Sequence, residues 1–348
     1  IYKRFLFCKY WSAFIYKMSH YKKYSVIGGS GFLGTSLCKK FNKNEISFEI
    51  IDIKKSNLYP ERTKIVDVRD LKSLSAAITG DIIINLAAVH RDDVSNIDEY
   101  YSTNVEGAKN IIQVCNEKNI KKIVFTSTVA VYGFSNIPVS ESGKTKPFNH
   151  YGKSKLMAEK LFKEWNKKSN TSLTIIRPTV IFGEGNRGNV FNLFNQINSG
   201  KFIMIGSGKN KKSMAYIENV SSFIESCIID ESDFSLFNYT DQPDMDMNTL
   251  VNIIRKTLKG KSTIGLRLPY AVGMFFGYLA DIASLIFSKK LPISSIRIKK
   301  FCKSSVFLSN TKNLHNFRAP YSLTEGIEKT LINEFINPDP NREIFYTE

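Results

Sequence analysis

The sequence predicts an α/β fold in which a doubly wound parallel sheet carries a smaller C-terminal lobe. Two observations support this prediction. Short apolar runs alternate with helical segments from residue 24 to residue 177, as is typical of parallel strands that are buried on both faces. Beyond Pro178 the regularity fades, and glycine-rich loops between residues 183 and 208 separate shorter elements. We expect these elements to form a substrate-binding lobe that grows from the carboxyl ends of the strands.

The individual elements follow from the order of the apolar runs. Strands are expected at residues 24–27, 46–52, 64–68, 81–88, 122–126 and 173–177. Helices are expected from residue 32, around 71–78, over 98–118 and over the segment that contains Tyr151.

A glycine cluster, Gly28-Gly-Ser-Gly31-Phe-Leu-Gly34, joins the first expected strand to the first helix. Residues without side chains allow a sharp turn and let a pyrophosphate approach the free N–H groups and the positive end of the helix. The next strand ends at Asp52, 18 residues after Gly34, close to the spacing of an acid that holds a ribose diol. Because a carboxylate repels a 2′-phosphate, Asp52 favours NAD over NADP, although Lys54 and Lys55 follow it. These features predict a Rossmann domain.

Tyr151 and Lys155 are four residues apart and therefore share one face of a helix. An ammonium beside a phenol favours the phenolate, so a group with an unperturbed pKa of ~10 can exchange protons nearer neutrality. The spacing alone also suits an ordinary solvated helix face. Its position downstream of the glycine cluster favours an acid–base pair.

The chain divides into three expected regions. Residues 1–17 are a leader or extension, because Met18 opens the short lead that precedes the first strand. This leader is basic and aromatic, and it is either an added upstream stretch or a membrane-binding arm. Residues 18–178 form the NAD-binding Rossmann domain. Residues 179–348 are mainly the substrate-binding lobe, with some segments that return to the sheet.

The composition limits the partners. A net charge of +17 suits an anionic membrane surface or a phosphorylated substrate, and no nucleic-acid-binding motif accompanies it, so no nucleic acid is expected. The five cysteines and four histidines are dispersed. This dispersal predicts a reducing, cytoplasmic compartment and no metal site.

The segment Leu266–Phe287 is long and apolar. It suits a core helix, a helix at a membrane surface or a membrane span. Asp281, Pro269 and the internal glycines favour the first two over a span. Lys289, Lys290, Arg297, Lys299 and Lys300 follow it, as suits the cytoplasmic face of an inner membrane.

A series of motifs occurs in a fixed order along the chain: Gly28-x-x-Gly31-x-x-Gly34, Asp67-Val-Arg-Asp70, Asn85-Leu-Ala-Ala88, Asn104-Val-Glu-Gly107, Thr126-Ser-Thr-Val-Ala-Val-Tyr-Gly133, Tyr151-Gly-Lys-Ser-Lys155 and Arg177-Pro-Thr-Val-Ile-Phe-Gly183. Together they resemble the extended short-chain dehydrogenase/reductases of the NAD-dependent epimerase and dehydratase type. The resemblance runs from about Met18 to the C-terminus.

The resemblance implies roles for individual residues. Thr128 directs a hydroxyl at the sugar oxygen, Tyr151 exchanges its proton, and Lys155 lowers the pKa of Tyr151 and bonds the nicotinamide ribose. A turn cap at Thr128 and a helix cap at Asn104 are the ordinary alternatives. The implied cofactor contacts are Gly28, Ser30, Gly31, Phe32, Leu33, Gly34, Asp52, Asp67, Val68, Leu86, Ala87, Ala88, Asn104, Tyr151, Lys155 and Arg177.

Two departures from the family pattern narrow the range of expected reactions and substrates. Val129 and Ala130 follow Thr128 where the 4,6-dehydratases carry Asp-Glu, so the acid and base for water elimination are missing. Lys212 and Ser213 stand where many soluble epimerases have Arg-Asp. The usual recognition of uridine diphosphate is therefore not expected.

Motifs outside the cofactor half are similar to a bacterial branch of the family. They include Phe148-Asn-His-Tyr151, Asn186-Arg-Gly-Asn-Val190, Lys212-Ser-Met-Ala-Tyr216 and Ser295-Ile-Arg-Ile-Lys-Lys-Phe-Cys302. Enzymes of this branch epimerise N-acetylglucosamine at C4 while it is linked to undecaprenyl diphosphate. The implied substrate contacts are Thr128, Asn189, Lys212, Arg297 and Lys300.

We therefore expect an NAD-dependent 4-epimerase that interconverts N-acetylglucosamine and N-acetylgalactosamine on undecaprenyl diphosphate, for surface polysaccharide (O-antigen) synthesis. A soluble UDP-sugar 4-epimerase, a nucleotide-sugar 4-keto reductase and a non-catalytic cofactor-sensing protein are the alternatives. The sequence is compatible with a homodimer but does not predict the oligomeric state.

Overall fold

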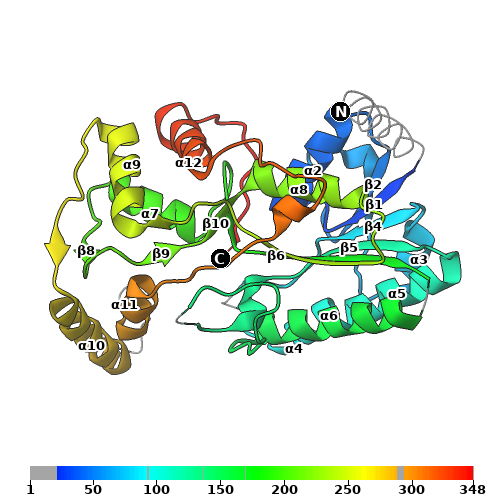
Figure 1. The fold of residues 1–348 in the computed structure, drawn as a ribbon, viewed down its shortest axis with the longest axis horizontal. Coiled ribbons are helices and arrows are strands. Elements are labelled where there is room, and N and C mark those ends of the chain that lie inside the picture. The colour runs from blue at the N-terminus through cyan, green and yellow to red at the C-terminus, as the bar shows by residue number, and fades with distance from the viewer. Residues whose placement is uncertain (1–21, 92–93, 136, 169, 288–293, 348) are drawn as a thin grey trace, which may run out of the picture.

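The computed structural model describes residues 22–91, 94–135, 137–168, 170–287 and 294–347. The expected leader at 1–17, Lys289 and Lys290 lie outside these residues. Figure 1 shows a sheet with helices on both faces beside a smaller part that contains α7, α9, α10 and α11.

The sheet has seven strands in the order β11-β6-β5-β4-β1-β2-β3, and all neighbouring pairs are parallel. This confirms the predicted doubly wound α/β fold. The strands are β1 (Tyr24–Ile27), β2 (Phe48–Asp52), β3 (Thr63–Ile65), β4 (Ile82–Asn85), β5 (Lys122–Thr126), β6 (Ser172–Pro178) and β11 (Phe234–Tyr239). The seventh strand, β11, returns to the sheet from the second half of the chain.

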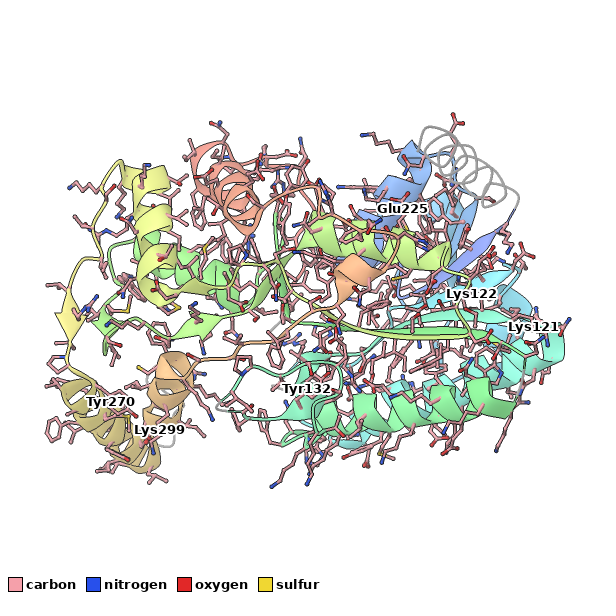
Figure 2. The ribbon with its side chains drawn as sticks, viewed as in Figure 1. Lys121, Lys122, Tyr132, Glu225, Tyr270 and Lys299 are labelled. Carbon is pink, nitrogen blue, oxygen red and sulfur yellow. The ribbon has the colours of Figure 1, made fainter. Side chains whose placement is uncertain are left out.

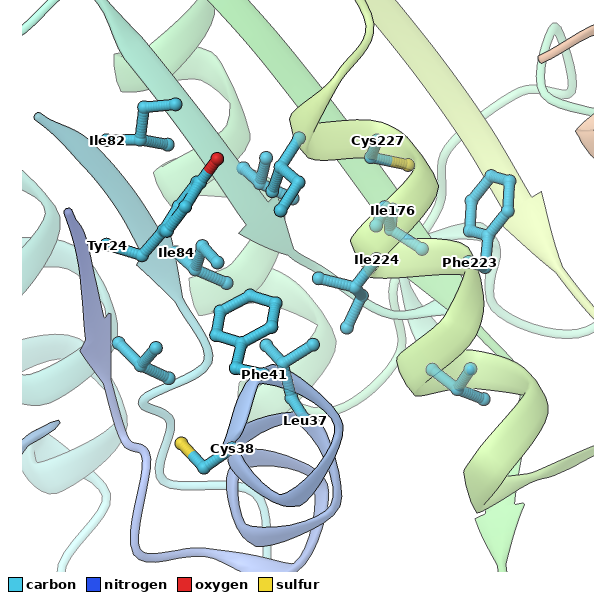
Figure 3. Close-up of a cluster of buried hydrophobic side chains, with 14 of the residues drawn as sticks. Tyr24, Leu37, Cys38, Phe41, Ile82, Ile84, Ile176, Phe223, Ile224 and Cys227 are labelled. Atoms are coloured by element: carbon cyan, nitrogen blue, oxygen red, sulfur yellow. The ribbon is translucent and has the colours of Figure 1, made fainter. Parts of the chain in front are cut away.

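Helices cover both faces of the sheet because its strands are apolar on both sides. One face is covered by α2 (Phe32–Lys43) and α8 (Ile217–Ile228), and the other by α3 (Leu71–Ala77), α5 (Gly107–Lys118) and α6 (His150–Lys168). Successive strand residues point to opposite faces. Val26 therefore joins the cluster under α2 and α8, whereas Ile27 joins the cluster under α5 and α6. Figure 3 shows the first cluster, in which Phe41 and Leu37 of α2 lie between β1 and α8.

One expected helix is interrupted. The predicted helix 98–118 consists of α4 (Asp98–Tyr101), a wide π turn (Ser102–Glu106) and α5. Shorter 3-10 turns occur at Pro60–Arg62, Val129–Tyr132 and Thr311–Asn313.

The smaller part has its own core. Its helices are α7 (Asn189–Asn198), α9 (Met247–Lys259), α10 (Tyr270–Phe287), α11 (Ser295–Cys302) and α12 (Leu323–Leu331), which ends in a π turn at Ile332–Ile336. Its short strands pair in twos: β7 (Val180–Phe182) with β10 (Met214–Tyr216), β9 (Lys211–Lys212) with β12 (Met245–Asp246), and β8 (Met204–Ile205) with β13 (Arg267–Leu268). Phe194, Val251 and Ile327 are fully buried among α7, α9 and α12.

Helix α10 is largely exposed. Only 17% of its residues are buried, so the structure does not support the core helix, one of the three settings that the sequence left open. Gly273, Met274 and Gly277 form the buried stripe, because a Cβ at Gly277 would lie 2.9 Å from Ile298 and Ser295 of α11. The other side chains face outward, among them Leu285 at 81% and Ile286 at 71% exposure. By length and composition, α10 is the one described helix that could cross a membrane.

The strand order reverses between β1 and β4, so the loops at their carboxyl ends leave in opposite directions and open a crevice. The glycine cluster follows β1 and the segment Leu86–Ala88 follows β4. The fold therefore places the expected cofactor loops at the position where open sheets of this kind bind ligands.

Candidate active site

Tyr151 and Lys155 lie in the first two turns of α6, on the face turned toward the sheet. Lys155 is 1% exposed, and its Nζ lies 4.2 Å from the centre of the Phe125 ring. Burial lowers the pKa of Lys155 to about 7, and the nearby Glu159 carboxylate partly opposes this shift. The His90 ring, which follows β4, meets the Tyr151 ring edge to face with 6.4 Å between the ring centres. The acid–base pair is thus walled by aromatic rings.

Thr128 lies in the loop that leaves β5. Its Oγ1 accepts a hydrogen bond from Ala130 N at 3.1 Å and so caps the turn Val129–Tyr132. This cap, which was the ordinary alternative for Thr128, still leaves the hydroxyl proton available for donation. The turn packs directly on α6, because a Cβ at Gly152 would lie 2.7 Å from Ala130 O. That close contact brings the Thr128 loop to the helix that carries Tyr151.

A buried polar network lies behind the Thr128 loop. Ser127 Oγ donates to Glu159 at 2.5 Å, and Arg177 donates to both Glu159 carboxylate oxygens at 2.8 and 2.5 Å. Arg177 also donates to Tyr132 OH at 2.6 Å, and Tyr132 donates to Asn238 at 2.7 Å. Figure 2 shows Tyr132 near the middle of the molecule, close to the junction of its two parts.

The structure gives Arg177 partners within the protein, and its contact with the cofactor stays a prediction. Its guanidinium is 3% exposed and is bonded to Glu159 and Tyr132. Breaking such a buried pair from one side costs ~3–5 kcal/mol. We assign Arg177 the role of holding the loop 127–133 in place.

The glycine cluster has the geometry of a phosphate cradle. Gly28 has a φ of +81°, and a Cβ there would lie 2.6 Å from Ala87 N. A Cβ at Gly34 would lie 2.4 Å from Gly28 O, so glycine is needed for α2 to pack on the turn. Gly31 is the N-cap of α2 and has no side chain to bond the free N–H groups of its first turn, which includes Phe32 and Leu33.

Asp52 lies at the end of β2 beside this cradle. Its carboxylate accepts hydrogen bonds from Ser30 N at 2.9 Å and from Lys54 N at 3.1 Å. Burial raises the pKa of Asp52 above its usual value, and these two bonds oppose the rise. The carboxylate therefore lies between the glycine loop and the next loop, where a ribose diol could reach it.

The other expected cofactor residues surround the same crevice. Asp67 is half-exposed and pairs with Arg69 at 2.5 Å, which lowers the pKa of Asp67, while Val68 is buried against Gly107. Leu86, Ala87 and Ala88 form the loop beside Gly28.

Asn104 is bonded to the loop that follows β4. It brackets Val89, since its Oδ1 accepts from Val89 N and its Nδ2 donates to Val89 O, each at 3.0 Å. Nδ2 also donates to Ser154 Oγ of α6 at 2.9 Å. With both amide protons engaged and the side chain buried, Asn104 shapes the loop Ala88–His90, and its contact with the cofactor stays a prediction.

These residues fit NAD. The cradle would hold the pyrophosphate, Asp52 the adenine ribose, and Tyr151 with Lys155 the nicotinamide ribose. The fit rests on the space that the glycines leave and on the free N–H groups of α2.

A pocket of about 200 Å³ lies beside the Thr128 loop. Three lysines line it, Lys212, Lys300 and Lys303, together with Phe134 and Phe148, whose rings stack with 4.3 Å between their centres. Lys300 Nζ lies 5.6 Å from the Phe148 ring centre and Lys303 Nζ 5.3 Å from that of Phe134. Gly133 and Phe148 belong to the segments that carry Thr128 and Tyr151, so the pocket and the expected acid–base pair share these segments.

The structure brings two of the expected substrate residues together. Lys212 and Lys300 meet at this pocket, although Lys212 Nζ also donates to the carbonyls of Lys300 and Lys303 at 2.9 and 2.5 Å. Thr128, Asn189 and Arg297 are not among the residues that line this pocket, and their contacts with the substrate stay predictions. Asn189 begins α7 beside a separate hollow, and Arg297 is exposed one turn before Lys300.

Sequence reasoning missed Lys303, Phe134 and His90. The first two lie in loops with no periodic pattern. His90 follows an expected strand end, and that position could have drawn attention to it.

Fold and site together define a Rossmann-type enzyme, with a threonine, a tyrosine and a lysine on the β5 loop and α6. The profile of the "NAD dependent epimerase/dehydratase family" matches residues 24–231. The chain belongs to this family, and NAD is its cofactor.

Three known proteins are similar over most of the chain. N-acetyl-alpha-D-glucosaminyl-diphospho-ditrans,octacis-undecaprenol 4-epimerase of Escherichia coli O157:H7 is 44% identical, over 93% of this chain and 98% of the relative. UDP-glucose 4-epimerase of Vibrio cholerae is 25% identical, over 89% and 94%. The crystal structure of UDP-N-acetylglucosamine 4-epimerase from Bacillus cereus superposes with a TM-score of 0.71 at 19% identity, over 93% and 99%.

Proposed function

We propose that this enzyme interconverts N-acetylglucosamine and N-acetylgalactosamine linked to undecaprenyl diphosphate, by transient oxidation and re-reduction at C4, for surface polysaccharide (O-antigen) synthesis. The observation that carries the proposal is 44% identity with the Escherichia coli enzyme of that activity over nearly the full length of both chains. The UDP-glucose 4-epimerase of Vibrio cholerae is only 25% identical over a similar span.

The acid–base residues support a redox-neutral cycle. NAD held by the glycine loop, Asp52, Tyr151 and Lys155 would supply the hydride acceptor and donor for C4 of the sugar. Tyr151 takes the C4-hydroxyl proton as a phenolate and gives it back, with the Lys155 ammonium stabilising the phenolate. Thr128 donates its free hydroxyl proton toward the same sugar oxygen. The buried pair Glu159–Arg177 keeps the Thr128 loop in register with α6.

The lysine and phenylalanine pocket suits the diphosphate. Lys300 and Lys303 reach it from α11 and the residues after it, and Lys212 reaches it from β9. Ammonium groups bind phosphate oxygens as point charges, and the stacked Phe134–Phe148 pair offers an apolar wall for the sugar or the first isoprene unit. The replacement of the common Arg-Asp by Lys212 and Ser213 fits a ligand that is not a uridine nucleotide.

Helix α10 suits attachment to the cytoplasmic face of a membrane. Its outward side chains are apolar almost all round, and Lys299 of the neighbouring helix lies 5.6 Å from the Tyr278 ring centre. Figure 2 shows Tyr270 and Lys299 at the end of the molecule farthest from the sheet. Apolar burial and attraction to anionic headgroups would add there. Among the described cysteines, Cys38, Cys115 and Cys227 are buried free thiols, as in a reducing compartment.

The test uses lipid-linked N-acetylglucosamine that carries deuterium at C4. We expect conversion to the N-acetylgalactosamine form with the deuterium retained and no net consumption of cofactor. Tyr151→Phe serves as the inactive control. Stoichiometric formation of reduced cofactor, with release of a 4-keto sugar, would instead identify a 4-keto reductase that runs in reverse on this substrate. No conversion of the lipid-linked sugar would overturn the proposal.

A further inference from the structure

Residues 342–347 form a segment that links the substrate lobe to the cofactor loops. The segment runs along the loop Gly183–Gly188, where Phe345 N donates to Gly185 O and Arg187 N donates to Phe345 O, both at 2.8 Å. Thr347 Oγ1 donates to Asn186 Oδ1 at 2.8 Å. These bonds attach the segment to the substrate lobe as a short parallel bridge.

The loop is built to receive this segment. A Cβ at Gly185 would lie 2.6 Å from Glu343 O, and a Cβ at Gly188 would lie 2.6 Å from Thr347 Oγ1. Glycine at both positions therefore leaves the space that the segment fills. On the other side of the loop, Glu334 accepts from Gly185 N at 2.6 Å and pairs with Arg187 at 2.9 Å.

Two side chains of the segment reach the cofactor half. The Phe345 ring packs on the Phe32 ring with 5.6 Å between the ring centres, and Phe32 is the first residue of α2 in the glycine loop. Glu343 accepts a hydrogen bond at 2.8 Å from Asn57, which lies in the loop after Asp52. The same short segment thus touches both loops that are expected to hold the pyrophosphate and the adenine ribose.

We infer that residues 342–347 are a strap that retains NAD, with Phe345 as a positioning residue that holds the glycine loop against the substrate lobe. A redox-neutral epimerase uses one cofactor molecule for both half-reactions, so release between them would strand a keto sugar. A strap across Phe32 and Asn57 opposes the separation of the two loops that release requires. The inference rests on NAD as cofactor and on the redox-neutral cycle, but not on the identity of the sugar.

The test is the rate at which bound NAD exchanges with an excess of radiolabelled NAD, measured without any sugar. Phe345→Ala should speed this exchange roughly fivefold to tenfold, the scale of one aromatic contact. Asn57→Ala should speed it less. Tyr346→Ala is the matched control, because Tyr346 is 71% exposed and adjacent in the chain, and it should exchange at the unmodified rate.

The thermal stability of the cofactor-free protein separates retention from general damage. Exchange that is unchanged in Phe345→Ala, or a stability loss without faster exchange, overturns the strap. If Phe345→Ala does not fold, Phe345→Leu replaces it, because leucine keeps an apolar contact but removes the ring pair. Exchange at the unmodified rate in both Phe345→Leu and Asn57→Ala would then overturn the strap. Since no sugar is present, the result is independent of the proposed substrate.

Discussion

At the residue scale, burial of Lys155 beside Tyr151 serves catalysis but lowers the free energy of unfolding. Burial lowers the pKa of its ammonium to about 7, whereas a lysine in the unfolded chain titrates near ~10.4. Below pH 7 both states are charged, and folding carries the full cost of burying the charge. Between these two pH values Lys155 is protonated in the unfolded chain but neutral in the folded protein. The free energy of unfolding therefore rises with pH in this range.

Lys155→Met should therefore raise the melting temperature of the cofactor-free protein most at about pH 6, and progressively less toward pH 10, while abolishing turnover. Scanning calorimetry across this range measures the difference. Lys160→Met, on the exposed face of the same helix, should show no such trend. A gain that does not change with pH would mean that Lys155 is not the group that titrates.

Tyr151→Phe removes only the phenolic oxygen from α6. Turnover should fall by ~100-fold or more, the scale of a lost acid–base group, while the unfolding temperature and NAD affinity stay near those of the unmodified enzyme. Steady-state kinetics and NAD titration check this. Near-normal turnover would remove Tyr151 from the mechanism.

Single residues were predictable where a motif forces a local geometry. Gly28, Gly34, Tyr151 and Lys155 lie where their spacing required. The ion pair of Arg177 with Glu159 could not be predicted, because it depends on how β6 packs on α6, and no local pattern in the sequence shows that packing.

At the element scale, the glycines of the loop after β1 have two different functions: Gly34 allows α2 to pack, and Gly31 leaves room for the pyrophosphate. A Cβ at Gly34 would lie 2.4 Å from Gly28 O, whereas a Cβ at Gly31 meets nothing closer than 3.4 Å. Gly34→Ala should destabilise the cofactor-free protein by ~1–3 kcal/mol through overpacking. Gly31→Ala should leave that stability within ~0.5 kcal/mol but weaken NAD binding by about tenfold, because the methyl group stands where the pyrophosphate approaches.

Denaturant unfolding and NAD titration of both variants measure the two effects. Equal loss of stability in the two variants would contradict this division of roles.

Periodicity predicted the strands and the α2, α5 and α6 helices because each is buried on a regular face. Periodicity could not show whether α10 is buried or exposed, since an apolar helix with small residues has the same sequence pattern in both cases. Only a narrow stripe of α10 is covered, where Gly273 packs on Ile205 of β8 and Gly277 packs on α11, and this contact is seen only in three dimensions.

For the molecule as a whole, the exposed face of α10 predicts reversible attachment to anionic bilayers. A chain lacking residues 1–17 should float with phosphatidylglycerol vesicles and less with phosphatidylcholine vesicles. The double variant Leu285→Asp/Ile286→Asp should lower this binding by roughly 100-fold, the loss of two buried apolar side chains.

Ile65→Asp is the matched control, because Ile65 is 64% exposed on β3 at the sheet edge, and it should bind vesicles normally. Equal binding by the double variant and this control would assign attachment to another surface.

The central claim is that the enzyme acts on the lipid-linked sugar. The most direct measurement offers N-acetylglucosamine diphosphoundecaprenol and UDP-N-acetylglucosamine together, at equal concentration in detergent micelles, and follows the C4 epimer of each. We predict that the lipid-linked sugar is consumed at least ~100-fold faster, a difference of ~2.8 kcal/mol in transition-state binding. Equal or faster conversion of UDP-N-acetylglucosamine would contradict the account and identify a UDP-sugar 4-epimerase.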